Sequence, residues 1–260
     1  MKLKLLGFLC ALTQCLSAHA GPVGATFFDL DVGQSSKKLP VYQVLAADAK
    51  ANFVVLPGGS AGFGKLVDGA PSSKKSLVRM QPLFAQAGAS TFAMFRPRGM
   101  TQDDMSYEYR LTDEHMEELR EVIRHIRSMS KAPVWLIGTS RGTVSATRAA
   151  LLMPNEIAGI VLTAAVVKKT VGNVSAQHVE QINTPVLMVH HVWDRCPVCP
   201  HDEAKVLIQR FTGSSRTAFI SIEGGSNPQE GVCGPLHWHG FPGAEQEVVD
   251  RVMKWVAESN

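Results

Sequence analysis

The chain has 260 residues, 45% of them hydrophobic, and its mean hydropathy is +0.02. This length and composition fit one globular domain with a sizeable core and exclude a largely disordered protein. The formal net charge is +3, and without Lys2 and Lys4 there remain 24 basic and 23 acidic residues. Such a balance gives no electrostatic support for nucleic-acid binding.

The first 20 residues have the pattern of a secretory signal peptide. A basic start precedes an apolar stretch from Leu5 to about Leu16, and Ala18-His-Ala20 supplies the small residues of a cleavage site. An uncleaved anchor is the alternative, but about a dozen apolar residues are too few to span a bilayer. We therefore expect cleavage after residue 20, a mature domain of residues 21–260, no membrane span, and a secreted or periplasmic location.

Short apolar, β-branched or aromatic runs alternate with amphipathic stretches along the rest of the chain. Strands are expected at residues 25–32, 40–46, 52–56, 91–95, 134–137, 157–166, 185–191 and 217–222. Helices are expected to end at residue 87 and to cover residues 112–129, 143–152, 202–211 and 244–257. This alternation predicts an α/β fold with a mostly parallel central sheet and helices on both faces. Its short connections leave room for a minimal lid or none.

The sequence Gly138-Thr-Ser-Arg-Gly142 fits the pattern G-x-S-x-G between a buried strand and a helix. A strand that turns abruptly into a helix forces the serine into a strained conformation, and the two glycines leave room for the close approach. The turn raises the Ser140 hydroxyl above the sheet, where it can act as a nucleophile. Glycine-rich turns also occur in phosphate-binding folds, so serine chemistry further requires an acid and a histidine.

An acid and a histidine do follow in chain order. Asp194 lies just beyond the strand at 185–191, where a carboxylate can orient a histidine and stabilise its protonated form. His239 lies before a glycine-containing turn that leads into the last helix, and we expect it to be the base. His237 is the rival base. Asp202 is the rival acid, although we expect it to cap the next helix.

Two loops at the carboxyl ends of predicted strands have the composition of ligand-binding segments. Pro57-Gly-Gly-Ser-Ala-Gly-Phe-Gly64 lets backbone N–H groups approach a ligand, and Leu66 stands where a phosphate-binding P-loop has serine or threonine. Arg96 and Arg98 lie on the loop after the strand at 91–95, where they can contact an anionic substrate. The alternative is that these arginines are solvated.

Backbone donors for an oxyanion are expected on both sides of the serine. In a serine hydrolase one N–H comes from the residue after the nucleophile, here Arg141, and another from the loop after the strand at 52–56. We expect Gly59 to supply the second donor, with Gly58 and Ser60 as alternatives.

Three cysteines, Cys196, Cys199 and Cys233, remain after signal cleavage, and an oxidising compartment favours their pairing. The odd number leaves one unpaired. The density of cysteine and histidine between residues 190 and 239 also raises zinc binding as an alternative, although the spacing matches no standard finger. The candidate ligands are His190, His191, Asp194, Cys196, Cys199, His201, His237 and His239. A thiol oxidoreductase based on the Cys-x-x-Cys sequence is a weaker alternative.

Together these motifs resemble the α/β-hydrolase superfamily, and more narrowly its small secreted bacterial serine hydrolases of mostly unknown substrate. The resemblance extends from about Asn52 to Val256, and the order serine, aspartate, histidine is the order of their catalytic triad. In that group a cysteine two residues after the acid and another six before the histidine look like a pair. The resemblance therefore implies a disulfide between Cys196 and Cys233, while pairing of Cys196 with Cys199 stays open.

These features predict a secreted serine hydrolase that acts on a small soluble ester and needs no cofactor or metal. His239 would take the proton of Ser140 while Asp194 holds the imidazole tautomer, and the serine would attack the carbonyl. Thioesters, lactones and peptides use the same groups, so the acyl and leaving groups are not predicted, and neither is the oligomeric state. A catalytically silent binding protein on the same scaffold is the alternative without chemistry.

Overall fold

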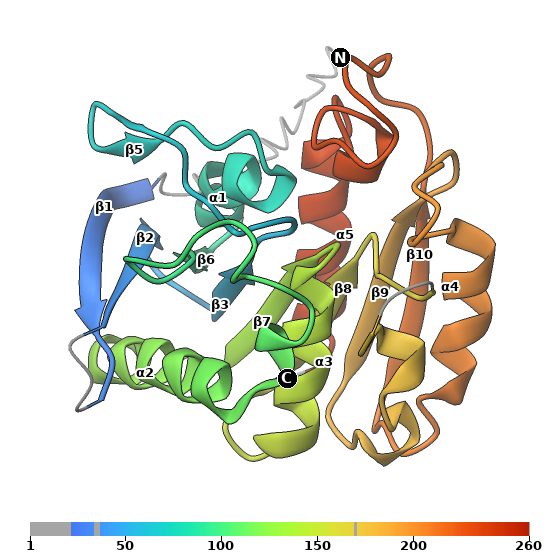
Figure 1. Ribbon diagram of the computed structural model, residues 1–260, viewed down its shortest axis with the longest axis horizontal. Coiled ribbons are helices and arrows are strands. Elements are labelled where there is room, and N and C mark those ends of the chain that lie inside the picture. Colours follow the sequence, from blue (N-terminus) through green and yellow to red (C-terminus); the bar gives the residue numbers. More distant parts are fainter. Residues whose placement is uncertain (1–21, 34–36, 169–170, 260) are drawn as a thin grey trace, which may run out of the picture.

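Eight strands form one mixed sheet in the computed structural model, which describes residues 22–33, 37–168 and 171–259 (Figure 1). The strand order is β1-β2-β6-β3-β7-β8-β9-β10. β2 pairs antiparallel with β1 and β6, and the other neighbouring pairs are parallel. The strands are β1 (Pro22–Asp31), β2 (Lys38–Ala46), β3 (Ala51–Leu56), β6 (Ala89–Met94), β7 (Val134–Thr139), β8 (Gly159–Thr163), β9 (Val186–His191) and β10 (Thr217–Ile222).

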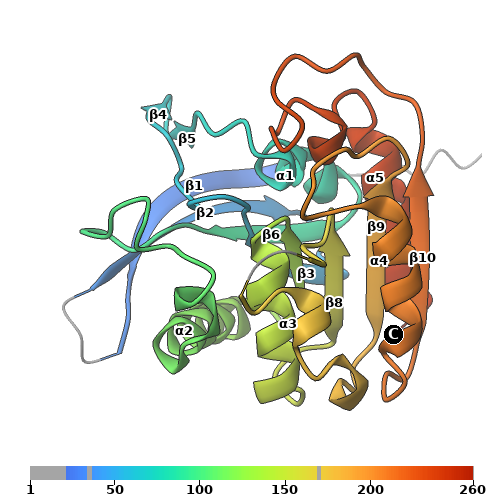
Figure 2. The same cartoon turned by 45° about the vertical axis from the view of Figure 1, so that its right-hand side comes forward.

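Helices cover both faces of this sheet, as the sequence predicts (Figure 2). In one hydrophobic cluster α1 and α5 pack against the sheet, and in the other α2, α3 and α4 pack against the opposite face. The helices are α1 (Ser76–Gln86), α2 (Asp113–Met129), α3 (Gly142–Leu152), α4 (His201–Leu207) and α5 (Glu245–Ala257). The two clusters enclose the sheet, so its central strands are buried on both sides.

The central strands divide their side chains between the two clusters. In β3, Phe53 and Val55 belong to the cluster of α1 and α5, whereas Val54 and Leu56 belong to the cluster of α2, α3 and α4. Successive residues of a strand point to opposite faces, so a strand covered on both faces has no polar side to show. The unbroken apolar runs of the sequence arise in this way.

Most differences from the sequence-based expectations lie at the ends of elements. The expected helix over residues 202–211 is α4 followed by a 3-10 turn, Ile208–Arg210. The prediction that Asp202 caps this helix is wrong, because the N-cap is Pro200 and Asp202 lies in the first turn. A small hairpin of β4 (Leu66–Val67) and β5 (Ala70–Pro71) has no counterpart among the predictions. The predicted signal peptide lies outside the described residues.

Between β8 and β9, as far as the structure describes this segment, the only regular elements are the 3-10 turns Val174–Ala176 and Val179–Gln181. The described part of this connection therefore contains no α-helix or strand. Within residues 22–33, 37–168 and 171–259 no helix is long and apolar enough to cross a membrane.

The start of α3 lies directly against the end of β3. A Cβ atom added at Gly142 would lie 1.9 Å from the carbonyl oxygen of Leu56, a distance that no real Cβ contact permits. A Cβ atom at Gly138 would likewise lie 2.5 Å from the carbonyl oxygen of Gly142. Both glycines of the G-x-S-x-G pattern are therefore required by backbone packing around the turn.

We expect Gly142→Ala to lower the free energy of unfolding by about 1 to 3 kcal/mol, because β3 or α3 must shift to admit the methyl group. Gly24→Ala is the matched control, since nothing lies within 4 Å of a Cβ at that position. Urea denaturation of both variants checks the prediction. Equal midpoints for the two variants would contradict the proposed close contact.

Candidate active site

Ser140 occupies the sharp turn between β7 and α3. Its φ angle is 51°, in the left-handed region that residues with a Cβ atom rarely adopt. The N–H of Ser140 donates to the carbonyl of Thr163 at 3.1 Å, and the N–H and hydroxyl of Thr143 donate to the Ser140 carbonyl at 2.9 and 2.6 Å. These bonds to β8 and α3 hold the strained residue in place, at the edge of the sheet where the parallel strands end.

Asp194 and His239 meet above the same edge, although 45 positions separate them in the chain. His239 Nδ1 donates to Asp194 Oδ2 at 2.8 Å, and the other carboxylate oxygen accepts the N–H of Cys196 at 2.9 Å. Both residues are buried, with exposures of 6% and 4%. Because Asp194 accepts at Nδ1, the lone pair of the neutral imidazole is placed on Nε2.

The free nitrogen of His239 belongs to a cavity that also contains Ser140. His239 Nε2 is buried and has no hydrogen-bond partner in the described part of the chain, and the ring is not bonded to Ser140 in this state. The cavity has a volume of about 140 Å³. Its lining consists of Gly58, Gly59, Lys75, Ser76, Thr139, Ser140, Cys233, Pro235, His239 and Gly240. The predicted nucleophile and the predicted base thus line one cavity.

The loop after β3 lies beside the serine. A Cβ atom added at Gly58 would lie 3.0 Å from Ser140 Cβ, which shows how closely the two backbones approach. Gly59 is also part of the cavity lining, and its φ angle of 57° directs the loop around the site. Within the described residues, no hydrogen bond involves the N–H of Gly59 or the N–H of Arg141. Both predicted oxyanion donors are therefore available to a ligand.

Solved structures resemble the chain over nearly its whole length. A dienelactone hydrolase from Anabaena variabilis is 18% identical, with a TM-score of 0.62, and the match covers 90% of this chain and 97% of that one. Est1E from Butyrivibrio proteoclasticus is 12% identical, with a TM-score of 0.61, over 90% and 98% of the two chains. An alpha-beta serine hydrolase homologue from Coxiella burnetii is 17% identical, with a TM-score of 0.58, over 91% and 97%.

The chain has the α/β-hydrolase fold. This confirms the predicted fold class and, at the level of the fold, the resemblance drawn from the sequence. No protein-family model and no curated protein matches the sequence itself. The roles of Ser140, Asp194 and His239 in catalysis stay predictions, now with a defined geometry.

In this α/β-hydrolase fold a disulfide joins the two loops that carry Asp194 and His239. Cys196 pairs with Cys233, and Cys199 is a free, buried thiol. The long pairing implied by the resemblance is the one present, and the local pairing of Cys196 with Cys199 is not. Burial is the main cause that raises the pKa of the Cys199 thiol, the charge of Asp194 raises it further, and the side chain of Ser140 opposes the rise.

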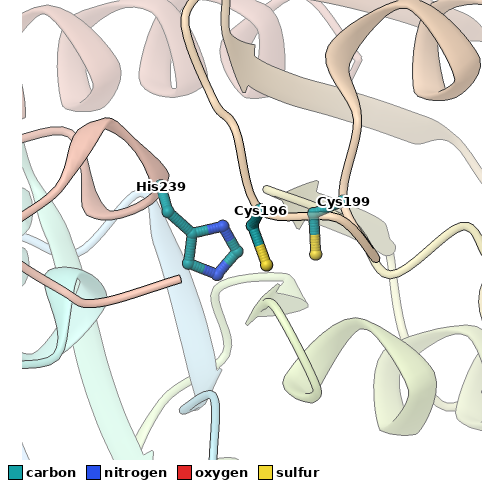
Figure 3. Close-up of side chains that lie close together, drawn as sticks. All are labelled: Cys196, Cys199 and His239. Atoms are coloured by element: carbon teal, nitrogen blue, oxygen red, sulfur yellow. The ribbon is translucent and has the colours of Figure 1, made fainter. Parts of the chain in front are cut away.

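The eight candidate zinc ligands do not form one cluster. Among the described residues, the one group of three or more whose donor atoms all lie within 4.8 Å of one another consists of Cys196, Cys199 and His239 (Figure 3). The sulfur of Cys196 is already in a disulfide, and His239 Nδ1 is bonded to Asp194. His190 and His191 lie in β9 with other partners, and His201 bonds to Asp202 and Ser221. A metal would need the disulfide to be reduced first.

A buried polar network holds the loop after β3, and no motif in the sequence predicts it. The Arg110 guanidinium donates to the carbonyls of Pro57 and Gly59 at 3.2 and 3.0 Å and to Ser145 Oγ at 3.0 Å. Ser145 Oγ also bonds to His115 Nε2 at 2.9 Å, and His115 Nδ1 bonds to the buried carboxylate of Glu118 at 3.0 Å. The network fixes the carbonyls of the loop from below, so its N–H groups can face the cavity.

The pH dependence of stability should depend in part on His190. Burial lowers its pKa to about 3, because the charged ring would lose its hydration, and its Nε2 accepts the N–H of Ala165 at 2.8 Å. The Asp194 carboxylate opposes this shift, while His201 and His239 add to it. Since the unfolded pKa is about 6.5, the unfolded chain binds more protons between pH 6.5 and 3, and stability falls as the pH falls through that window.

We expect this single histidine to account for a loss of up to about 5 kcal/mol across the window. His190→Gln keeps an acceptor for the Ala165 N–H but does not titrate, so its stability should fall less steeply with decreasing pH. His178→Gln, at an exposed histidine, should keep the wild-type slope. Urea denaturation at a series of pH values measures all three slopes. The same slope for His190→Gln and wild type would contradict the prediction.

Removal of the disulfide should destabilise the protein. The bond closes a loop with a sequence separation of 37, for which the chain-entropy relation gives about 3 to 4 kcal/mol. We expect the double variant Cys196→Ala and Cys233→Ala to lose that amount, whereas Cys199→Ala should keep the bond and lose less. Denaturation with and without a reducing agent tests this. An unchanged midpoint for the reduced wild type would show that the bond does not restrain these loops.

Proposed function

We propose that the protein is a secreted or periplasmic serine hydrolase of carboxylesterase type, acting on small soluble esters. The observation that carries the proposal is the buried Asp194–His239 hydrogen bond, which leaves an unpaired Nε2 in the cavity that Ser140 lines. Resemblance in fold to a dienelactone hydrolase and to Est1E supports hydrolysis as the reaction class. The disulfide is compatible with an oxidising compartment.

In the proposed mechanism His239 Nε2 takes the proton of the Ser140 hydroxyl as its oxygen attacks the ester carbonyl. Asp194 holds the ring orientation and stabilises the imidazolium that forms. The N–H groups of Arg141 and Gly59 donate to the oxyanion of the tetrahedral intermediate. His239 then gives its proton to the leaving alkoxide, and a water activated by the same nitrogen releases the acyl group from the serine.

The first test is labelling with a fluorophosphonate, which reacts with activated serines. We expect wild type to be labelled and Ser140→Ala to remain unlabelled, with a chelator having no effect. His239→Ala and Asp194→Asn should lower kcat for a simple phenyl ester by about 10³- to 10⁴-fold, since each removes the base or its orientation. His237→Ala, at the neighbouring histidine, is the matched control and should stay within a few-fold of wild type.

Intact mass of protein exported with its native N-terminus tests the proposed cleavage after residue 20 in the same preparation. Labelling of Ser140→Ala, or a folded wild type that takes no label, would refute the proposed nucleophile.

Zinc binding is the second candidate, and the grouping of Cys196, Cys199 and His239 is the observation that favours it. Two of these three ligands are cysteines, which bind zinc as thiolates, so zinc binding here requires the reduced form of the protein. Elemental analysis of the purified protein, together with a count of free thiols, separates the two candidates. One free thiol and no zinc would leave the hydrolase proposal, whereas three free thiols with one equivalent of zinc would replace it.

A further inference from the structure

Lys75 lies in the same cavity as the candidate nucleophile. It is the last residue before α1, and it lines the cavity together with Ser140 and His239. Its ammonium donates to the carbonyl of Gly62 at 3.3 Å and forms no ion pair within the described part of the chain. The adjacent Lys74, in contrast, is exposed and lies 3.9 Å from the carboxylate of Glu230.

Three arginines surround this ammonium and the serine, and none of them has an ion pair among the described residues. Arg110 is buried and bonds to backbone carbonyls and Ser145, Arg96 donates to the carbonyl of Ser60 at 3.1 Å, and Arg141 packs on the ring of Tyr107 at 4.7 Å. Elsewhere the arginines commonly pair with acids, as Arg216 does with Glu258. Lys75 and these three arginines are therefore four cations without an acidic partner in the described part of the chain.

The arginines also influence the protonation of Lys75. Burial lowers the pKa of its ammonium, and the charges of Arg110 and Arg96 lower that pKa further. The acids Asp104 and Glu108 influence this region from the surface, but neither forms an ion pair there. Lys75 thus brings a partly desolvated ammonium into the cavity, and the charges of Arg110 and Arg96 add to the positive potential there, which is favourable for an anionic ligand.

A second cavity is lined by the next residues of the loop after β3. It has a volume of about 380 Å³ and is lined in part by Ser60, Gly62 and Arg96. Gly62 lines this second cavity, and its carbonyl accepts a hydrogen bond from the ammonium of Lys75, which lines the first cavity. Arg98 lines the same cavity but is paired with Asp29 at 3.1 Å, so it is the less available charge.

We propose that the esters hydrolysed at Ser140 carry a carboxylate, and that Lys75 binds this carboxylate while Arg96 and Arg110 supply a positive surrounding field. The inference rests on the proposed hydrolase function and names its substrate class. A single ammonium in a small cavity matches one negative charge, and because Lys75 and Ser140 line the same cavity, one ligand can place its carboxylate at the first and its ester at the second. Lys75 is then the residue that determines specificity.

The test compares each acid with its uncharged primary amide. Phenyl hydrogen adipate and its amide place the charge on the acyl side, and 4-acetoxyphenylacetate and its amide place it on the leaving-group side. We expect wild type to prefer the acid in at least one pair by about 10- to 100-fold in kcat/KM, as for a hydrogen bond to a charged group. The preference should shrink as salt is added.

The variants identify the residue responsible. Lys75→Met should abolish the preference for the acid, expressed as the ratio of the two kcat/KM values, and Lys75→Arg should restore part of it. Lys74→Met, one residue away, should keep the wild-type ratio. Thermal denaturation of each variant establishes that it is folded before the ratios are compared.

A binding measurement on a variant that lacks Ser140 tests this inference separately from the hydrolase proposal. In Ser140→Ala protein, calorimetry should detect binding of 4-acetoxyphenylacetate or phenyl hydrogen adipate that is lost when Lys75→Met is added. Equal rates for acid and amide in both pairs, or a full preference retained by Lys75→Met, would overturn the inference while Ser140-dependent hydrolysis stood. Absence of labelling and of all ester hydrolysis would overturn the hydrolase proposal, and calorimetry would still decide whether Lys75 binds carboxylates.

Discussion

The contact between the start of α3 and the end of β3 is the constraint on which the site depends. The carbonyl of Leu56 occupies the space that a side chain at residue 142 would need, so the helix can approach only through Gly142. The same approach brings the loop after β3 against Ser140, where Gly58 is nearly in contact with it. A left-handed residue between strand and helix costs on the order of 1 to 3 kcal/mol, which the surrounding hydrogen bonds offset. The same close packing of α3 on β3 therefore positions both the proposed nucleophile and the loop of the proposed oxyanion donor Gly59.

Buried charge is the second organising factor, and each buried charge is held by hydrogen bonds rather than by solvent. Asp194 accepts from His239 and from the backbone of Cys196, so its carboxylate is fixed in position and orients the ring. On the other side, Glu118 begins a chain of bonds that ends at Arg110 and the loop carbonyls. The loop after β3 is held in place by these bonds, so in the proposed mechanism its N–H groups can stabilise a developing oxyanion without having to reorganise.

Local sequence patterns predicted the strands, the turn at the serine, and the candidate acid and base. The strand at 217–222 and the turn at Ser140 follow from apolar runs and glycine spacing, and the order of acid and histidine led to Asp194 and His239. The sequence already favoured His239 over His237, and the fold adds the hydrogen bond between His239 and Asp194, which forms between loops distant in sequence. The role of Arg110 could not be predicted from the sequence, because its burial depends on contacts with the loop after β3 and with α3. The cap predicted at residue 202 failed because the helix starts earlier, after a proline.

The two candidate functions exclude each other on chemical grounds. Hydrolysis needs His239 with Nδ1 bonded to Asp194 and Nε2 free, whereas a metal bound with Cys196 and Cys199 would take one of those nitrogens and both sulfurs. The disulfide to Cys233 removes one of the sulfurs and ties the loop of His239 to the loop of Asp194. Oxidation therefore blocks the metal site with the same bond that holds the proposed base and acid together. The redox state of the compartment then selects which chemistry these residues can perform.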